Sequence, residues 1–74
     1  MSPSLPVVSG AEAVRSLAKV GFFWASQRGS HVKLRHDDGR VAIVPLHREL
    51  ARGTLRSVLR QAGISTDEFA ALLE

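Results

Sequence analysis

The sequence has no cysteine, and only four of its 74 residues are aromatic. Without cysteine, neither disulfide bonds nor thiolate metal sites can hold the fold, and nothing indicates an oxidising compartment. No apolar run approaches the roughly 20 residues that cross a bilayer, and the start of the chain lacks the basic and long apolar segments of a secretory signal. These absences favour a cytoplasmic protein with no membrane segment.

The length leaves room for one small domain. A domain of this size buries only about 60% of the surface that its unfolded chain exposes, so its core must be efficient. Residues 1–8 contain two prolines and two serines and show neither helical nor strand periodicity. We therefore expect a flexible N-terminal arm at residues 1–8 and a single domain at residues 9–74.

Positive charge is concentrated in residues 28–60. This segment contains eight basic residues and three acidic ones, and seven of the basic residues are arginines. The planar guanidinium group can bind phosphate through two parallel hydrogen bonds, whereas lysine acts as a point charge. An anionic polymer is therefore the expected partner, and a solvated basic surface that binds nothing is the alternative.

A helix is predicted near the start of the domain. Ser9 and Glu12 have the S-x-x-E spacing of a capping box, in which each side chain accepts a hydrogen bond from the backbone N–H of the other residue. Apolar residues then recur at helical spacing, and Gly21 is placed to end the helix in the left-handed conformation. These apolar residues are Ala13, Val14, Leu17 and Ala18.

Two strands are predicted next. Residues 22–27 are aromatic at their start and polar at their end, which fits a short strand better than a helix. Stacking of Trp24 on a nucleic acid base is one interpretation, but core or half-buried packing is the commoner role of a tryptophan in a small domain. The second strand, residues 31–36, follows an Arg28-Gly29-Ser30 connection.

Residues 28–35 form the stretch around which the rest of the chain is organised. Because side chains alternate across a strand, His31, Lys33 and Arg35 share one face, while the two apolar residues between them share the other. The apolar face can anchor the strand. The other face presents an imidazole among positive charges, which is suited to binding a phosphodiester.

Asp38-Gly39 lies between two alternating runs, which is the strongest short-range signal for a two-residue hairpin turn. A turn at these residues would pair Leu34 with Ile43. It would place Val41 and Ile43 on the core face of the sheet and Ala42 on the outer face.

A longer helix is predicted after the third strand. Pro45 cannot donate a hydrogen bond to a neighbouring strand and is expected to end the third strand. Thr54 is the expected N-cap, the apolar residues after it fall at i, i+3, i+4 and i+7, and Gly63 follows as the stop. Arg56 and Arg60 lie on the opposite flank, where a like-charge pair costs about 0.2–0.5 kcal/mol and so indicates a use.

A short last helix should close the chain. Ser65 and Glu68 repeat the capping-box spacing, and three apolar residues follow at helical spacing. A helix this short is marginal alone, so it must dock on the domain or on a partner. The order is thus helix, three antiparallel strands, helix, short helix, which is an α+β fold with one face of the sheet packed on helices and the other facing outward.

This order of elements, together with several motifs, resembles the HicA toxins, and the likeness runs from about Ser9 to the C-terminus. The motifs are Arg28-Gly29-Ser30-His31-Val32-Lys33-Leu34-Arg35-His36, Asp38-Gly39-Arg40, Val44-Pro45-Leu46-His47, Gly53-Thr54-Leu55-Arg56 and Arg60-Gln61-Ala62-Gly63-Ile64-Ser65. The Gly-Ser-His element alone is weak evidence, but the combination in this order is fairly specific.

The resemblance implies an α-β-β-β-α fold similar to a double-stranded-RNA-binding domain, and activity as a small endoribonuclease that cuts mRNA and arrests translation. It also implies a HicB-like antitoxin that binds the toxin and occludes its active site, and a complex that binds its own operator DNA through the antitoxin. In the family the catalytic histidine lies in this strand, which matches His31, and the family glycine before it matches Gly29.

Metal-free cleavage of RNA needs a base for the 2′-hydroxyl, an acid for the leaving 5′-oxygen and cations for the charge that develops at phosphorus. Histidine titrates near neutral pH and can fill either proton-transfer role, so His31 is the candidate catalytic residue. Nearby cations would stabilise the transition state. The candidate RNA-binding residues are Arg28, Gly29, Ser30, Lys33, Arg35, Arg56 and Arg60.

The second proton-transfer group is left open between His36 and His47, of which His36 has core-facing parity. The three histidines are 5 and 11 residues apart with no cysteine beside them, so neither a metal site nor another cofactor is expected. The alternative function is a non-catalytic RNA-binding module that uses the same basic face, with His31 as an ordinary surface residue.

Overall fold

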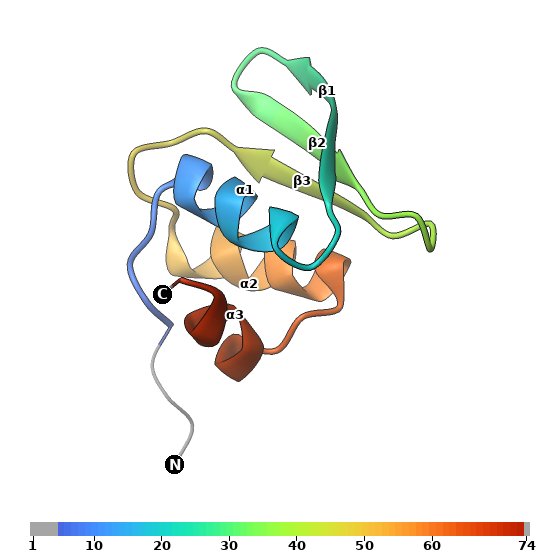
Figure 1. Cartoon of the computed structure of the whole chain (residues 1–74). Helices are drawn as coiled ribbons and strands as arrows, with labels where there is room; N and C mark the ends of the chain where they lie inside the picture. Colours follow the sequence, from blue (N-terminus) through green and yellow to red (C-terminus); the bar gives the residue numbers. More distant parts are fainter. Residues whose placement is uncertain (1–4, 74) are drawn as a thin grey trace.

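Three antiparallel strands form one sheet in the order β1-β2-β3, and helices cover one of its faces (Figure 1). The computed structural model describes residues 5–73. The elements are α1 (Gly10–Ala18), β1 (Phe23–Arg28), β2 (His31–Arg35), β3 (Val41–Pro45), α2 (Arg52–Ala62) and α3 (Thr66–Leu72). The sequence-based prediction of an α+β fold with the topology of a double-stranded-RNA-binding domain and a short last helix is confirmed.

The hydrophobic core lies between the sheet and the helices. Its largest fully buried side chains come from all the elements except β1, and each such side chain contributes roughly 1.5–3 kcal/mol when it leaves water. They are Leu17, Val32, Leu34, Val44, Leu55, Val58 and Phe69. α1 and α2 lie against β3, and α3 packs on α1.

The turn between β2 and β3 has three residues, 37–39, where the sequence predicted two. The N–H of His36 donates to the Arg40 carbonyl at 3.0 Å, and the N–H of Gly39 donates to the His36 carbonyl at 2.9 Å. Gly39 has a φ of 97°, which suits the left-handed residue that ends a three-residue hairpin loop. The Asp38 carboxylate accepts the backbone N–H of Arg40 at 3.0 Å and so stabilises the longer loop.

The extra loop residue shifts the β2–β3 register by one and exchanges the faces of β3. Leu34 pairs with Ala42 rather than with Ile43. Ala42 and Val44 are therefore buried in the core, whereas Val41 and Ile43 are only partly buried on the outer face. The predicted placement of Val41, Ala42 and Ile43 is thus wrong, because the side-chain period of two turns a one-residue slip into a change of face.

β1 and β2 are joined by Gly29 and Ser30. Gly29 has a φ of 57°, and every residue described with a positive φ is a glycine, which is the pattern of a type II′ turn. All residues of β1 are exposed, and the hairpin projects beyond the helices (Figure 1). A bulge between Trp24 and Ser26 interrupts the pairing, and Phe23 and Trp24 keep 48% and 50% of their surface exposed.

α1 begins at the predicted capping box. The Ser9 hydroxyl accepts the N–H of Glu12 at 3.0 Å, and the Glu12 carboxylate accepts the N–H of Ser9 at 2.9 Å. Gly21 follows the helix with a φ of 98°. Both predictions for this helix are confirmed.

The segment before α1 is partly packed. Leu5 and Val8, which the sequence placed in a flexible arm, belong to the buried core. The N–H of Leu50 donates to the Val8 carbonyl at 2.8 Å, so this segment is also joined to the connection before α2. The rest of the predicted arm, residues 1–4, lies outside the described residues.

α2 begins earlier than predicted. Its N-cap is Ala51, whose carbonyl accepts the N–H of Leu55 at 2.9 Å, so Thr54 lies inside the first turn. Leu50 is buried just before the helix, and no side chain caps the helix start. The predicted end is confirmed, because Gly63 follows the helix with a φ of 67°.

α3 begins at the second capping box, as predicted. The Ser65 hydroxyl accepts the N–H of Glu68 at 3.1 Å, and the Glu68 carboxylate accepts the N–H of Ser65 at 3.0 Å. Phe69 is fully buried and docks the short helix on the core. Within residues 5–73, no helix combines the length and apolar character needed to span a membrane.

Candidate active site

The candidate site lies at the start of β2, on the outer face of the sheet. Arg28 pairs with His31 across the hairpin, so their side chains lie on the same face. The N–H of Leu46 donates to the Ser30 carbonyl at 2.6 Å. This bond ties the turn to the chain that leaves β3, and the position of His31 is therefore set by backbone contacts on both sides.

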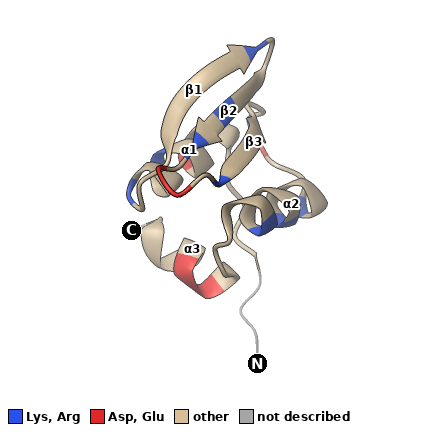
Figure 2. Cartoon of the chain, turned by 90° about the vertical axis from the view of Figure 1, so that its right-hand side faces the viewer, with Lys and Arg blue, Asp and Glu red and all other residues tan. Residues whose placement is uncertain are grey.

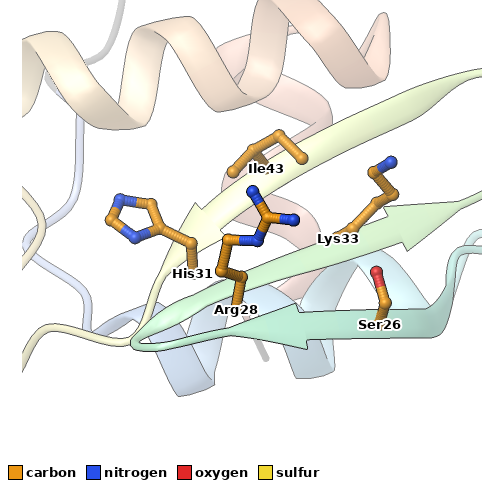
Figure 3. A pocket seen from close by; sticks show the side chains of 5 residues that line it. All are labelled: Ser26, Arg28, His31, Lys33 and Ile43. Atoms are coloured by element: carbon orange, nitrogen blue, oxygen red, sulfur yellow. The ribbon is translucent and has the colours of Figure 1, made fainter.

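An open pocket of about 330 Å³ lies beside His31 and is lined by Ser26, Arg28, His31, Lys33 and Ile43 (Figure 3). The sequence predicted Arg28, His31 and Lys33 together. It missed Ser26 because Arg28 was placed in the connection and not in β1, where alternation puts Ser26 on the same face as Arg28, and it missed Ile43 because of the β3 register. A three-residue turn at residues 37–39, ending in Gly39, is the alternative reading of the sequence that would have placed Ile43 on this face.

The cations of this face have no protein partner. Among residues 5–73, the side chains of Arg28, Lys33 and Arg35 make no hydrogen bond and no ion pair, and no carboxylate lines the pocket. Figure 2 shows lysine and arginine on the β1–β2 hairpin and α2, acidic residues on α3 and in the β2–β3 turn, and charges of both signs around α1. The positive charge is therefore available to an anion from outside.

Five of the seven predicted RNA-binding residues do not line the pocket: Gly29 and Ser30 form the turn between β1 and β2, and the other three are arginines. Arg35 is exposed at the opposite end of β2, and Arg56 and Arg60 are exposed on α2. The N–H of Ile43 donates to the Gln61 side chain at 2.7 Å, so α2 packs against the open edge of β3. The three arginines can contact an extended polyanion but not the group bound beside His31.

His47 lies close to His31. The centres of the two rings are 6.5 Å apart and the rings are inclined at 74°. The end of β3 lies beside the start of β2 because the strands are antiparallel, and a histidine two residues after β3 therefore comes close to this site. Of the two histidines that the sequence left open, His47 is the one that the fold brings to His31.

His36 is held by structural contacts instead. Its Nε2 lies 3.0 Å from the Val20 carbonyl, and its Nδ1 accepts the N–H of Asp38 at 3.1 Å. Its ring also packs edge-on against Phe22, with the ring centres 5.1 Å apart. These contacts occupy both ring nitrogens and place His36 at the core side of the sheet.

Arg40 also serves the fold. Its guanidinium group donates to Asp38 at 2.8 Å and to the Ala62 carbonyl at the end of α2, and it lies 5.1 Å above the Phe22 ring. The backbone N–H of Arg40 donates to the Asp38 carboxylate and is the main cause that lowers the pKa of Asp38 below its ordinary value. Within residues 5–73, no group of three or more His, Asp or Glu side chains is arranged to hold a metal ion.

Comparison with known proteins gives one family. A family model described as the HicA toxin of bacterial toxin-antitoxin systems matches residues 10–64, which is more than half of the chain. The match spans α1, the sheet and α2, and it includes both His31 and His47. No curated protein shows significant similarity to the chain.

Proposed function

The chain belongs to the HicA toxin family of bacterial toxin–antitoxin systems, and from this premise we propose that it is a metal-independent endoribonuclease that cleaves mRNA with His31 as a catalytic acid or base. Toxins of this family are known as mRNA interferases. The observation that carries the proposal is the pocket that joins His31 to Arg28 and Lys33, two cations without a hydrogen bond or ion pair in the described part of the chain.

The reaction that fits these groups is an internal transfer at phosphorus. The RNA 2′-hydroxyl loses its proton to a base and forms a bond to the adjacent phosphorus, and the bond from phosphorus to the 5′-oxygen breaks. The leaving 5′-oxygen takes a proton from an acid. The products are a 2′,3′-cyclic phosphate and a 5′-hydroxyl end, so no external oxidant or reductant is required.

The protein groups supply charge as well as proton transfer. The phosphorane-like transition state carries more negative charge on its oxygens than the ground state, and fixed cations stabilise it preferentially. Arg28 is suited to hold two phosphate oxygens at once. A side chain on Gly29 would meet no protein atom within 4 Å, so a phosphate can approach the backbone of Gly29 and Ser30.

The remaining basic residues are proposed to hold the RNA on either side of the cleaved bond. Lys33 and Arg35 continue along the outer face of β2, and Arg56 and Arg60 extend the positive surface onto α2. Contacts of this kind position the strand without reading its sequence. They predict binding that weakens as salt is raised.

The family implies a cognate antitoxin, and we propose that a HicB-like partner covers His31 together with the basic residues around it. The toxin is small, so a partner of ordinary interface size would cover much of the sheet face. Binding of operator DNA by the complex is assigned to the antitoxin. If His31 in a purified complex reacted with a histidine reagent as fast as in the free toxin, occlusion of the site would be wrong.

The test of the catalytic proposal compares the wild type with His31→Ala. Both proteins are expressed from a tightly controlled promoter, and growth and RNA integrity are measured in the same cultures after both are shown to fold. We expect only the wild type to stop growth and fragment mRNA, and the purified wild type to keep cutting RNA with a metal chelator present. Arg15→Ala, an exposed change on α1, is the matched control and should behave as wild type.

Equal cutting by His31→Ala would exclude His31 as the catalyst. The second candidate function is a non-catalytic RNA-binding module, favoured by the unpartnered cations along β2, which require no chemistry. Salt-sensitive RNA binding by the wild type with no cleavage over hours would select it.

A further inference from the structure

The proximity of His47 to His31 indicates a role for His47 that the function proposed above does not assign. This role rests on that proposed function. We infer that His47 is the second proton-transfer group of the cleavage reaction, so that the two imidazoles act on the same phosphodiester, one as base and one as acid. Both side chains are exposed. The RNA can therefore reach both without a change in the fold.

The separation of the rings suits this division of roles. Ring centres 6.5 Å apart are too distant for a direct hydrogen bond between the two imidazoles. They are close enough for each to lie within about 2.6–3.2 Å of a different oxygen on one phosphate, the reach that proton transfer requires. One nitrogen then faces the attacking 2′-oxygen and the other faces the leaving 5′-oxygen.

The backbone around His47 holds this geometry. His31 pairs with Pro45 at the end of β3. The N–H of Leu46 donates to the Ser30 carbonyl, and the N–H of Gly10 donates to the His47 carbonyl at 2.9 Å. The residues immediately before and at His47 are thus tied to the hairpin turn on one side and to the start of α1 on the other.

The close approach of α1 is possible only because residue 10 is a glycine. A methyl group on Gly10 would overlap the Pro45 carbonyl oxygen and lie 2.8 Å from Leu46 Cα. This crowding lies in the segment that carries His47. The packing of the first helix residue therefore sets where the second imidazole lies.

Arg28 and His36 do not fit the second role. The guanidinium group of Arg28 is suited to binding phosphate oxygens and not to proton transfer, and the nitrogens of His36 are engaged by Val20 and Asp38. No carboxylate lines the pocket formed by residues 26–43. Imidazole is the side chain whose ordinary pKa suits both giving and accepting a proton near neutral pH.

The experiment uses two RNAs that differ in one atom. Wild-type cleavage of an RNA is mapped first, and the same RNA is then made with sulfur in place of the bridging 5′-oxygen at the mapped bond. A thiolate leaves without a proton, so this substrate needs the base but not the acid. The wild type, His31→Ala and His47→Ala are assayed on both RNAs, with Glu49→Gln as the control in the same exposed loop.

We expect each histidine variant to cut the unmodified RNA about 10²–10⁴-fold more slowly than wild type, the usual contribution of general acid–base catalysis. On the sulfur substrate one variant should regain most of its rate, which identifies the acid, and the other should stay slow. Glu49→Gln should match wild type on both. His47→Gln keeps a polar side chain that cannot transfer a proton, and it should behave as His47→Ala. Agreement between the two variants would show that the loss comes from the missing imidazole and not from a changed loop.

Three results would overturn the inference. The first is wild-type cleavage of unmodified RNA by His47→Ala. The second is an equal loss by His47→Ala and His31→Ala on both substrates, which is the result expected if His47 only supports the loop. The third is a wild type that cuts no RNA at the mapping step, in which case the proposed function fails too; the first two results require an active wild type and are therefore distinguishable from it.

Discussion

The two hairpin turns of the sheet contain similar residues and use them in opposite ways. In the partnered turn, residues 36–40, the side chains of His36, Asp38 and Arg40 all bond to protein groups. In the open turn, residues 28–31, Arg28 makes no hydrogen bond or ion pair with any residue from 5 to 73, and the side chain of His31 makes a ring contact with His47 but no hydrogen bond within the same residues.

The difference separates structural from functional residues of the same type. A small domain has little stability to spare, so polar groups that can support the fold usually do so. Arg40 joins the partnered turn to the end of α2, whereas Arg28 is held beside His31 and left for solvent or a ligand. Partners rather than residue type therefore distinguish the two arginines and two of the three histidines.

Among the variants that compare the two turns, Arg28→Ala should have the largest effect, and it should fall on activity alone. Loss of one positioned group that stabilises transition-state charge costs about 10²–10³-fold in rate. Because the side chain has no partner among the described residues, the midpoint of urea unfolding should not change. Cleavage rates and urea unfolding curves measured on the same preparation check both the loss of rate and the unchanged unfolding midpoint. A lowered midpoint with an unchanged rate would remove the distinction between the turns.

Arg40→Ala should show the reverse behaviour. The variant loses charged hydrogen bonds to Asp38 and Ala62, and we expect the free energy of unfolding to fall by about 1.5–3 kcal/mol. The lower end is expected because the side chain is 34% exposed. Cleavage per folded molecule should stay at the wild-type rate, measured at a temperature well below the unfolding transition. A rate loss as large as that of Arg28→Ala would place Arg40 in the site.

Gly10→Ala tests what holds the open turn and the histidine pair in place. The added methyl overlaps the Pro45 carbonyl oxygen, and overpacking of this kind costs about 1–3 kcal/mol. Because the strain falls on the segment that carries His47, cleavage should slow even where the protein remains folded.

Gly53→Ala is the matched control for Gly10→Ala. Gly53 lies in the first turn of α2, has no positive φ, and a methyl group there would meet no atom within 4 Å. Removing this glycine should raise the free energy of unfolding by about 0.4–1 kcal/mol, because the unfolded chain loses freedom. Equal behaviour of the two variants would contradict the close approach at Gly10.

Local signals in the sequence predicted most of the fold. The two capping boxes and Gly21 and Gly63 at helix ends were readable because each depends on residues a few positions apart. The start of α2 was not, because no side chain caps it and the residue before it, Leu50, bonds to Val8, which lies far away in the sequence. The faces of β3 were missed because a one-residue change in loop length exchanges them.

The candidate site was predictable in part for the same reason. Arg28, His31 and Lys33 come from one hairpin, so alternation along β1 and β2 brings them together. Ile43 comes from the third strand and depends on its register, while His47 depends on how α1 packs against the end of β3. The sequence did not predict the partners of Arg40 and His36, because these side chains bond to Ala62 and Val20, which lie far away in the sequence.

Asp38→Asn should give the smallest effect, and it concerns only the partnered turn. The backbone N–H of Arg40 lowers the pKa of the Asp38 carboxyl in the folded protein, so the ionised form contributes stability that is present above the unfolded pKa of about 3.9. That contribution is lost as the pH falls through the lower folded pKa. The asparagine oxygen can still accept the Arg40 N–H, but the asparagine side chain does not titrate.

The wild type should therefore lose slightly more stability than Asp38→Asn between pH 5 and pH 3, as measured by urea unfolding. Asp37→Asn is the control and should show the wild-type dependence of stability on pH, because Asp37 makes no hydrogen bond or ion pair within residues 5–73. A matching change in slope at Asp37 would mean that general charge, rather than the bond within the partnered turn, sets the acid sensitivity.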